Sequence, residues 1–440
     1  MLDVLEAHIR SNASRWGLDL PAGAHLSALV RANPEHDGVV QEFGAGQVGT
    51  VLFWFRANDR APFLVSKIAG ASLSVQAIRD CDALHQRANA VLGYSLFPAL
   101  YEVSEHQGAA VVFMEALEGP NYDVELARAA TGPERSSAAL RRVVARQLGE
   151  LGKALRDLRQ VRLSDGVATW GDPALRHAED FFGLCPAARE AFGAARLERM
   201  RALIDSEPLE THLVLTEDHV ANYLPGPRAV DQLVADLPAL CRSWPGPVDG
   251  LRLLISLFRA SPLQEAFSDY HWVDALAACT LGEEEHPVLS PPVKQFLADL
   301  GLGAARAELL WALLTGVFFL RGWQELRFHS RNPLLADRLR AEYLGFARRM
   351  AEVFDTTSKD RPAMRLRVPR LDVAALDGEF ADREAPSFMS PQRVFVEPRE
   401  ANAPPLVQAV RVALAPYPRL RRAARVAYRL ARTGRLRGRN

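Results

Sequence analysis

Hydrophobic and polar residues over positions 38–117 follow the short, β-rich pattern of strands in five places and a helical pattern in one. β-Branched and aromatic residues dominate the five segments, which is typical of half-buried strands. They cover residues 38–43, 50–57, 62–69, 98–106 and 109–117. Apolar spacing of three and four predicts a helix over residues 74–92, between the third and fourth strands. We therefore expect a five-stranded antiparallel sheet with one helix.

Two helices are predicted before this sheet. Residues 2–14 form a short amphipathic pattern, and a second helical pattern begins at Ser27 and ends at Pro34. Residues 1–37 are therefore expected to be a helical extension ahead of a small lobe at residues 38–117.

The pattern turns helical from Ser136. Residues 139–160 are the strongest amphipathic segment, and residues 307–323 form an apolar run whose length fits a buried helix. A strand-rich segment, residues 211–238, interrupts the helices. We expect a helical lobe at residues 118–354, an extended, proline-rich wrap or linker at 355–405 and a basic amphipathic tail at 406–440.

The composition fits a globular protein, with 440 residues, 48% hydrophobic and 24% charged. The sequence has no apolar run of about 18 residues and no secretory leader pattern at its start, so we expect a cytoplasmic location. The four cysteines are far apart and form no C-x-x-C pair, which disfavours a zinc site or a disulfide framework.

The formal net charge of zero hides an uneven distribution. Residues 401–440 contain ten arginines and no acidic residue, which leaves 43 basic against 53 acidic residues in the rest of the chain. Such a tail can dock on the chain's own acidic body, or on an anionic membrane surface or lipid-linked substrate at the inner membrane face. Nucleic acid is disfavoured because no aromatic residues are interleaved and no nucleic-acid module accompanies the arginines.

Residues 41–55, QEFGAGQVGTVLFWF, contain the spacing G-x-G-x-x-G at Gly44, Gly46 and Gly49. This spacing occurs in dinucleotide-binding turns and in kinase glycine loops. A dinucleotide turn would open a helix, whereas TVLFWF predicts a strand. The glycines are therefore predicted to be a hairpin tip that covers a nucleotide; a glycine hairpin without a ligand is the alternative.

Lys67 ends the third predicted strand, 18 residues after Gly49. Its neighbours Leu64, Val65 and Ile68 are apolar, so its ammonium needs an anionic partner. A nucleotide phosphate and an acid of the next helix are the candidates, and Asp80 is favoured over Asp82. A surface lysine on an edge strand is the alternative.

Two further segments carry candidate chemistry. VVFMEALEG is a buried strand that stops at a joint, where backbone groups can bind an adenine edge. In LVLTEDHVANYL and VADLP, Asn222 and Asp236 are candidate Mg²⁺ ligands, and Glu217 or Asp218 can orient or deprotonate a hydroxyl. The alternatives are an ordinary strand end and a turn whose polar side chains cap local backbone groups.

Taken together and in order, these segments resemble the protein-kinase-like fold, and in particular the aminoglycoside and choline kinase branch of small-molecule phosphotransferases. That family has a glycine lid, a phosphate lysine, a helix acid, a hinge, HGDxxxxN and a second metal-binding aspartate. The matching positions are Gly44, Gly46, Gly49 and Val51, then Lys67, Asp80, Glu115 and Leu117, then Asn222 and Asp236; Asp249 matches an aspartate that braces the catalytic loop.

The resemblance implies a bilobal α+β fold, with a small five-stranded antiparallel N-lobe and a large helical C-lobe. It also implies ATP and Mg²⁺ as cofactors and transfer of phosphate to a hydroxyl of a small molecule or glycan.

One departure leaves two functions open. The family's HGD reads LTE here, so either Glu217 takes the aspartate's place, or Asp218 does in a loop one residue shorter. The longer glutamate moves its carboxylate by about 1.5 Å, and a misplacement of about 1 Å can cost about a hundredfold in rate. A pseudokinase that binds nucleotide or a partner without catalysis is therefore the alternative to an active kinase. A protein kinase fits less well because the chain has no HRD, DFG or APE segment.

Overall fold

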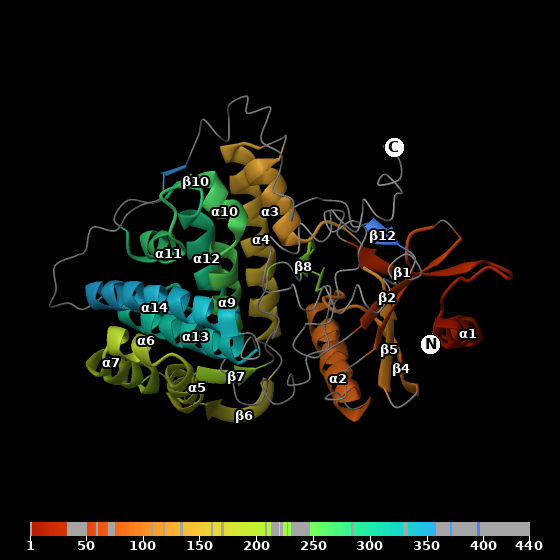
Figure 1. Ribbon diagram of the computed structural model, residues 1–440, viewed down its shortest axis with the longest axis horizontal. Coiled ribbons are helices and arrows are strands. Elements are labelled where there is room, and N and C mark those ends of the chain that lie inside the picture. Colours follow the sequence, from red (N-terminus) through yellow and green to blue (C-terminus); the bar gives the residue numbers. More distant parts are fainter. Residues whose placement is uncertain are drawn as a thin grey trace, which may run out of the picture.

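The computed structural model of the chain has two lobes (Figure 1). A sheet with helices α1 (Leu2–Asn12) and α2 (Val75–Leu92) forms the small lobe, and the helices from α3 (Tyr122–Thr131) to α14 (Pro333–Thr356) form the large one. The structure describes residues 2–32, 51–58, 60–68, 75–106, 109–117, 119–132, 135–159, 162–168, 171–206, 209–212, 220, 223–226, 228–229, 247–282, 286–328, 333–357, 370–371 and 394–396.

The strands of the small lobe form one sheet in the order β12-β1-β2-β3-β5-β4, in which each neighbouring pair is antiparallel. The strands are β1 (Leu26–Ala32), β2 (Val51–Ala57), β3 (Leu64–Ile68), β4 (Leu100–His106), β5 (Ala109–Glu115) and β12 (Val394–Val396). The predicted α+β architecture, a small five-stranded antiparallel sheet followed by a helical lobe, is confirmed by β1–β5. The additional strand β12 comes from the far end of the chain.

The first strand of this sheet is not the predicted one. The helix expected from Ser27 to Pro34 is wrong, because Leu26–Ala32 forms β1 and pairs with β2. Leu26 and Ala28 are 2% and 7% exposed and belong to the core of the small lobe, and pairing in the sheet outweighs the helix propensity of alanine and leucine. The strand expected at residues 38–43 lies outside the described residues. The extension expected at residues 1–37 is helical in α1 and joins the sheet from Leu26 onward.

The two faces of the sheet are covered by different helices. On one face Leu5 and Ile9 of α1 pack with Phe55 and Phe113. On the other face Ile78 of α2 packs with Val103 and Val112. Val112 and Phe113 are neighbours in β5 and point to opposite faces, because side chains alternate along a strand. The predicted helices at residues 2–14 and 74–92 are confirmed as α1 and α2.

The large lobe is a stack of helices around one hydrophobic core. Between α3 and α14 they are α4 (Ser137–Leu158), α5 (Gly171–Leu184), α6 (Pro186–Phe192), α7 (Ala194–Asp205), α9 (Pro247–Phe258), α10 (Ser261–Ala266), α11 (Trp272–Leu281), α12 (Ser290–Asp299) and α13 (Ala307–Phe328). Side-chain caps start two of them: Asn121 accepts the Val124 N–H at 2.9 Å, and Ser136 accepts the Ala139 N–H at 3.0 Å. The predicted helices at 139–160 and 307–323 are confirmed as α4 and α13.

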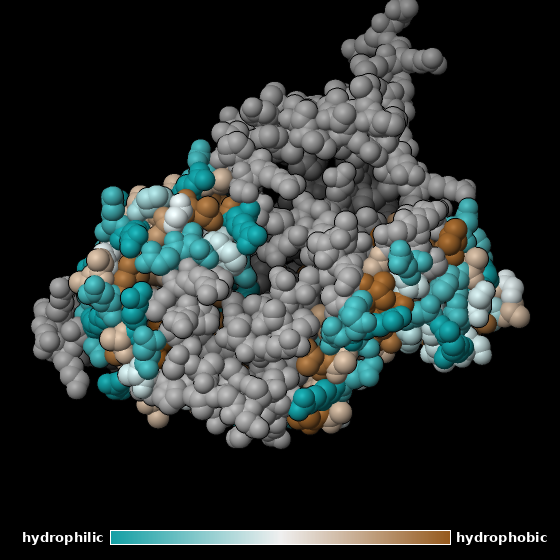
Figure 2. All heavy atoms as spheres, turned by 90° about the horizontal axis from the view of Figure 1, so that it is seen from below, coloured by the Kyte–Doolittle hydropathy of each residue, from teal (hydrophilic) through white to brown (hydrophobic). Residues whose placement is uncertain are grey.

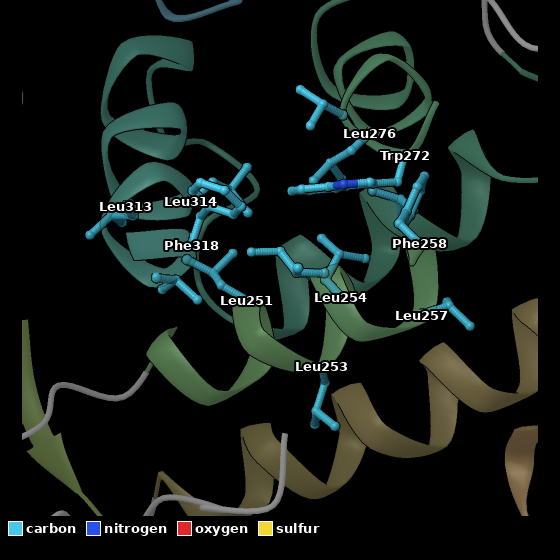
Figure 3. Close-up of a cluster of buried hydrophobic side chains, with 14 of the residues drawn as sticks. Leu251, Leu253, Leu254, Leu257, Phe258, Trp272, Leu276, Leu313, Leu314 and Phe318 are labelled. Atoms are coloured by element: carbon cyan, nitrogen blue, oxygen red, sulfur yellow. The ribbon is translucent and has the colours of Figure 1, made fainter. Parts of the chain in front are cut away.

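Helix α9 is the centre of this core, since every residue from Pro247 to Phe258 is buried. Figure 3 shows Leu251 and Leu254 of α9 beside Trp272 of α11 and Phe318 of α13. The Trp272 and Phe318 rings are 5.8 Å apart between centroids. A helix that is buried on all sides is typical of a core element, and α9 is buried along its whole length even at its polar residues Asp249, Arg252 and Ser256.

Short strands connect these parts. Strand β6 (Arg162–Ala168), which the sequence did not predict, pairs with β7 (Leu209–His212), and β8 (Tyr223–Leu224) pairs with β9 (Arg228–Ala229). Strands β7 to β9 lie at or inside the strand-rich segment expected at residues 211–238.

The segment expected to be a linker, residues 355–405, contacts both lobes. Its strand β11 (Arg370–Leu371) pairs with β10 (Phe267–Ser268) in the helical lobe, and its strand β12 pairs with β1 in the small lobe. The basic tail at residues 406–440 lies outside the described residues.

The described surface is mostly polar. On the face shown in Figure 2, hydrophobic residues occupy small areas between hydrophilic ones on both lobes. Among the described large hydrophobic residues, Val4 and Val91 are the exposed ones, at 45% and 42%. Among the described helices, none has the length and apolar character needed to cross a membrane.

Two glycines test the packing of the helical lobe. A Cβ added at Gly322 of α13 would lie 2.6 Å from the Phe181 ring and 2.9 Å from the Tyr343 ring, whereas one added at Gly345 of α14 would meet no atom within 4 Å. We expect Gly322→Ala to lower the free energy of unfolding by about 1–3 kcal/mol through overpacking, and Gly345→Ala to raise it by up to about 1 kcal/mol through helix propensity. Urea unfolding of both variants measures whether the free energy of unfolding falls or rises in each. Equal effects would contradict the close contact of α5 with α13.

Candidate functional site

The predicted site residues divide between described and undescribed parts of the chain. Lys67, Asp80, Glu115 and Leu117 are described with their side chains, and Val51 with its backbone. The others, Gly44, Gly46, Gly49, Glu217, Asp218, Asn222 and Asp236, lie outside the described residues, so their roles stay predictions. Within the described part of the chain, no group of three or more His, Cys, Asp or Glu side chains could hold a metal ion.

Lys67 is buried inside the sheet. It lies in β3, opposite Leu52 of β2 and Val112 of β5, and its exposure is 4%. Burying an ammonium group costs several kcal/mol unless an anionic or hydrogen-bonding partner compensates. The alternative of a surface lysine on an edge strand is therefore wrong: β3 is an inner strand, and Lys67 is in the core.

The register also places the strand that follows the glycines. Val51 lies opposite Ile68, and Leu52 lies opposite Lys67. The residue of β2 that pairs with Lys67 is therefore Leu52, which directly follows the predicted lid residue Val51.

An apolar row lies next to Lys67 on the same face of the sheet. Trp54 is opposite Val65, and Val65 is opposite Met114, so the three side chains form one cross-strand row. They are 4–6% exposed, and Ala116 packs against them. Because Val65 and Lys67 are two residues apart in β3, this row and the lysine share a face. A cation beside an apolar surface suits a ligand with an aromatic ring and an anionic group.

Helix α2 lies over the same face, and its two candidate acids differ in position. Helical geometry places Asp80 about 200° around the axis from Ile78, and Asp82 about 40° from it. Asp80 is exposed and accepts a hydrogen bond from Gln76 Nε2 at 2.8 Å on its own helix. Asp82 is half-buried, and burial raises the pKa of its carboxyl, while its bond from Gln86 acts against this. Asp82, the less favoured candidate from sequence, is therefore the acid nearer the sheet side of α2.

The joint after β5 contains the two predicted hinge residues. The Glu115 N–H donates to the Ala99 carbonyl at 2.8 Å, and the Glu115 carboxylate accepts the Ala99 N–H at 3.1 Å. The Ala116 N–H donates to the Phe63 carbonyl at 3.4 Å. These two N–H groups already have protein acceptors, so a base bound here must use other backbone groups. Leu117 is 7% exposed, and Gly119 follows with a φ of +139°, a conformation that favours glycine.

The predicted catalytic loop is anchored to the helical lobe at its described residues. The Val220 N–H donates to Ser256 Oγ of α9 at 3.3 Å, and Val220 is 1% exposed. Tyr223, one residue after Asn222, is fully buried, and its ring stacks with that of Tyr122, with centroids 6.3 Å apart. Asp249, in the first turn of α9, is 1% exposed. The described residues Val220 and Tyr223 are therefore both held against the core of the helical lobe.

The hairpin after the loop is held by a residue that the sequence did not single out. Glu150 of α4 accepts the Gly226 N–H at 3.1 Å and the Tyr122 O–H at 2.5 Å, both at Oε2. In α4, Glu150 lies among the buried residues Leu148, Leu151 and Gly152. Its position beside the apolar face of the helix was the one sequence feature that could have indicated its role. Ser256 was hidden in the same way inside the apolar run of α9.

The sheet β1–β5, the single helix between β3 and β4, and the helical lobe after the β5 joint define a bilobal α+β fold of the protein-kinase-like kind. The solved structure of a glucosamine kinase (crystal form B) is similar at 17% identity and a TM-score of 0.32, over 75% of this chain and 74% of that one. No protein-family model and no curated protein matches the chain. At this TM-score and identity, the similarity is too weak to assign a family or a substrate.

His85 of α2 gives the small lobe a pH-dependent stability. It is 6% exposed and stacks on Phe97, with ring centroids 4.2 Å apart, and burial lowers its pKa from 6.5 to about 4. Between these values the unfolded chain binds a proton that the folded chain does not. Stability present above pH 6.5 is therefore lost as the pH falls toward 4, by about 3 kcal/mol.

We expect His85→Leu to flatten the loss of unfolding free energy between pH 6.5 and pH 4. Urea unfolding at several pH values measures this, with His25→Gln, at an exposed histidine, as the control. A wild-type slope in His85→Leu would contradict the assignment.

Proposed function

We propose that the protein is an ATP- and Mg²⁺-dependent phosphotransferase that acts on a hydroxyl of a small molecule or glycan. The observation that carries the proposal is the buried Lys67 on a sheet face lined by Trp54, Val65 and Met114. The motifs of the aminoglycoside and choline kinase branch, in their family order around that lysine, support the same function.

The described residues fit a nucleoside triphosphate. The apolar row can contact a purine ring, and the Lys67 ammonium can bind its phosphates, which is the role of the corresponding lysine in kinases. Gly44, Gly46 and Gly49 are proposed to cover the phosphates. Asp82 is now the favoured helix acid, in place of Asp80, because it lies on the sheet side of α2 and is half-buried.

Asn222 and Asp236 are the proposed Mg²⁺ ligands. Mg²⁺ takes few protein oxygens and keeps waters, so an amide and a carboxylate suffice for a metal that also binds phosphate. When bound, the ion neutralises charge on the phosphates. The anchors at Val220 and Tyr223, on either side of residues 221–222, support a fixed position for Asn222.

The acceptor hydroxyl is proposed to lie beside Glu217 or Asp218. In the reaction, the hydroxyl oxygen forms a bond to the γ phosphorus, the bond from that phosphorus to the β,γ-bridging oxygen breaks, and ADP leaves. The hydroxyl proton goes to the carboxylate. The chain's contribution is position and charge.

A pseudokinase is the second candidate, and one specific observation favours it. The sequence LTE replaces HGD, so the aspartate that accepts the proton is lost or displaced. A pseudokinase would have the same nucleotide site as the proposed phosphotransferase but would not transfer phosphate. The basic tail at residues 406–440 is proposed to dock on the acidic body of the chain or on an anionic membrane surface, where a lipid-linked acceptor would be available.

A binding measurement distinguishes both candidates, which bind nucleotide, from a protein of the same fold that binds none. We expect wild-type protein to bind ATP with Mg²⁺ in calorimetry, and both Lys67→Met and Asp236→Ala to weaken binding at least about tenfold, since each removes a charge-assisted contact. Lys153→Ala, at an exposed lysine of α4, is the matched control. If wild type and Lys67→Met behave alike, the nucleotide does not bind at Lys67.

Phosphoryl transfer separates the two candidates. We expect single-turnover incubation with labelled ATP and a metabolite or glycan extract to produce a labelled acceptor. Either Glu217→Gln or Asp218→Asn should lower the transfer rate about a hundredfold, and the affected variant identifies the base. Nucleotide binding without transfer to any acceptor would favour the pseudokinase.

A further inference from the structure

The β8–β9 hairpin begins one residue after the proposed metal ligand Asn222. Tyr223 and Leu224 are 0% and 5% exposed, so the first strand of the hairpin is fixed in the core. Its turn contains Gly226, which has a φ of +92°. A hairpin this short has few backbone hydrogen bonds of its own, and its position therefore depends on contacts from outside.

The contact from outside is made by Glu150. Its Oε2 accepts the Gly226 N–H at 3.1 Å, across 76 residues of sequence. The same oxygen accepts the Tyr122 O–H at 2.5 Å. One carboxylate oxygen therefore joins α4, α3 and the hairpin turn.

The other end of this contact is rigid. Tyr122 is fully buried at the start of α3, and its backbone carbonyl accepts Gln147 Nε2 of α4 at 2.8 Å. The Tyr122 ring also stacks with that of Tyr223, in β8. Burial, together with the bond to Glu150, raises the pKa of the Tyr122 phenol well above its ordinary value, so the hydroxyl remains a donor at working pH. Tyr122 thus holds both the carboxylate and the strand.

Charge makes the contact stronger than an ordinary turn bond. Hydrogen bonds to an ionised carboxylate are about twice as strong as neutral ones. Residues that orient a metal ligand from outside the coordination shell typically contribute about 10–100-fold to metal affinity. Glu150 lies at one end of the β8–β9 hairpin, and Asn222 immediately precedes the other.

We propose that Glu150 is a positioning residue for the metal site: it fixes the β8–β9 turn and, through Tyr122, the strand residue Tyr223 that directly follows the proposed ligand Asn222. The inference rests on the proposed function, because Asn222 is a metal ligand in that proposal alone. Loss of Glu150 is expected to raise the Mg²⁺ concentration needed for ATP binding, and to leave the affinity for ATP without Mg²⁺ unchanged.

The test compares Glu150→Gln with Glu125→Gln in the full chain. Glu125 of α3 is a matched control, because it pairs with Arg146 of α4 in the same region. The readouts are calorimetric binding of ATP over a series of Mg²⁺ concentrations, and hydrogen exchange, followed by mass spectrometry, of the peptide that contains residues 223–229.

We expect Glu150→Gln to raise the Mg²⁺ concentration for half-maximal ATP binding about tenfold and to speed exchange of that peptide about tenfold. Binding of ATP without metal stays unchanged, and Glu125→Gln behaves as wild type in both readouts. If Glu150→Gln fails to fold, Tyr122→Phe removes one of the two bonds to Glu150 and should shift both readouts in the same direction by less.

An unchanged Mg²⁺ requirement in Glu150→Gln, or an equal change in Glu125→Gln, would overturn this inference while leaving the proposed function intact. Failure of wild-type protein to bind ATP with Mg²⁺ would overturn the proposed function and this inference together.

Discussion

The arrangement of the two lobes depends on one helix that packs into two hydrophobic cores. Ile78 of α2 packs on the sheet with Val103 and Val112, whereas Cys81 and Ala88 belong to the core of the helical lobe. Figure 1 shows α2 between the sheet and the helices. Burial of a large apolar side chain such as Ile78 stabilises by about 1.5–3 kcal/mol, and burial of smaller ones such as Ala88 by less, so contacts on both sides of α2 together hold the lobes. The sheet face that contains Lys67 is thereby placed toward the helical lobe.

The position of Lys67 on this face of the sheet supports a role in binding an anionic ligand. An inner strand with Val, Leu and Ile neighbours is an expensive place for an ammonium group, and the lysine is one of four in a chain whose other basic residues are arginines. The apolar row Trp54–Val65–Met114 beside it leaves the cation next to a surface suited to an aromatic ring. On the facing lobe, α9 and Glu150 hold the described residues on both sides of Asn222. The proposed site would therefore combine the buried Lys67 of the small lobe with residues of the helical lobe that flank Asn222.

Strong periodicity made much of the fold predictable. Helices α2, α4 and α13 and strands β2 to β5 follow from apolar spacing that tertiary contacts reinforce. Strand β1 was mistaken for a helix because its Ala, Leu and Arg residues favour a helix locally, and pairing with β2 reverses that preference. Strand β12 could not be predicted, since three residues carry no periodicity and their partner lies more than 360 residues away in sequence. Within the site, the burial of Lys67 followed from its neighbours, while Glu150 and Ser256 become visible only once the chain brings their partners to them.

Lys67 and the apolar row beside it are proposed to form a nucleotide site between the lobes. A crystal structure of the protein with Mg²⁺ and a non-hydrolysable ATP analogue tests this most directly. We expect a purine ring in contact with Val65 and Met114, and a phosphate oxygen within hydrogen-bond distance of Lys67 Nζ. A nucleotide bound elsewhere, with Lys67 Nζ in contact with protein groups alone, would contradict it.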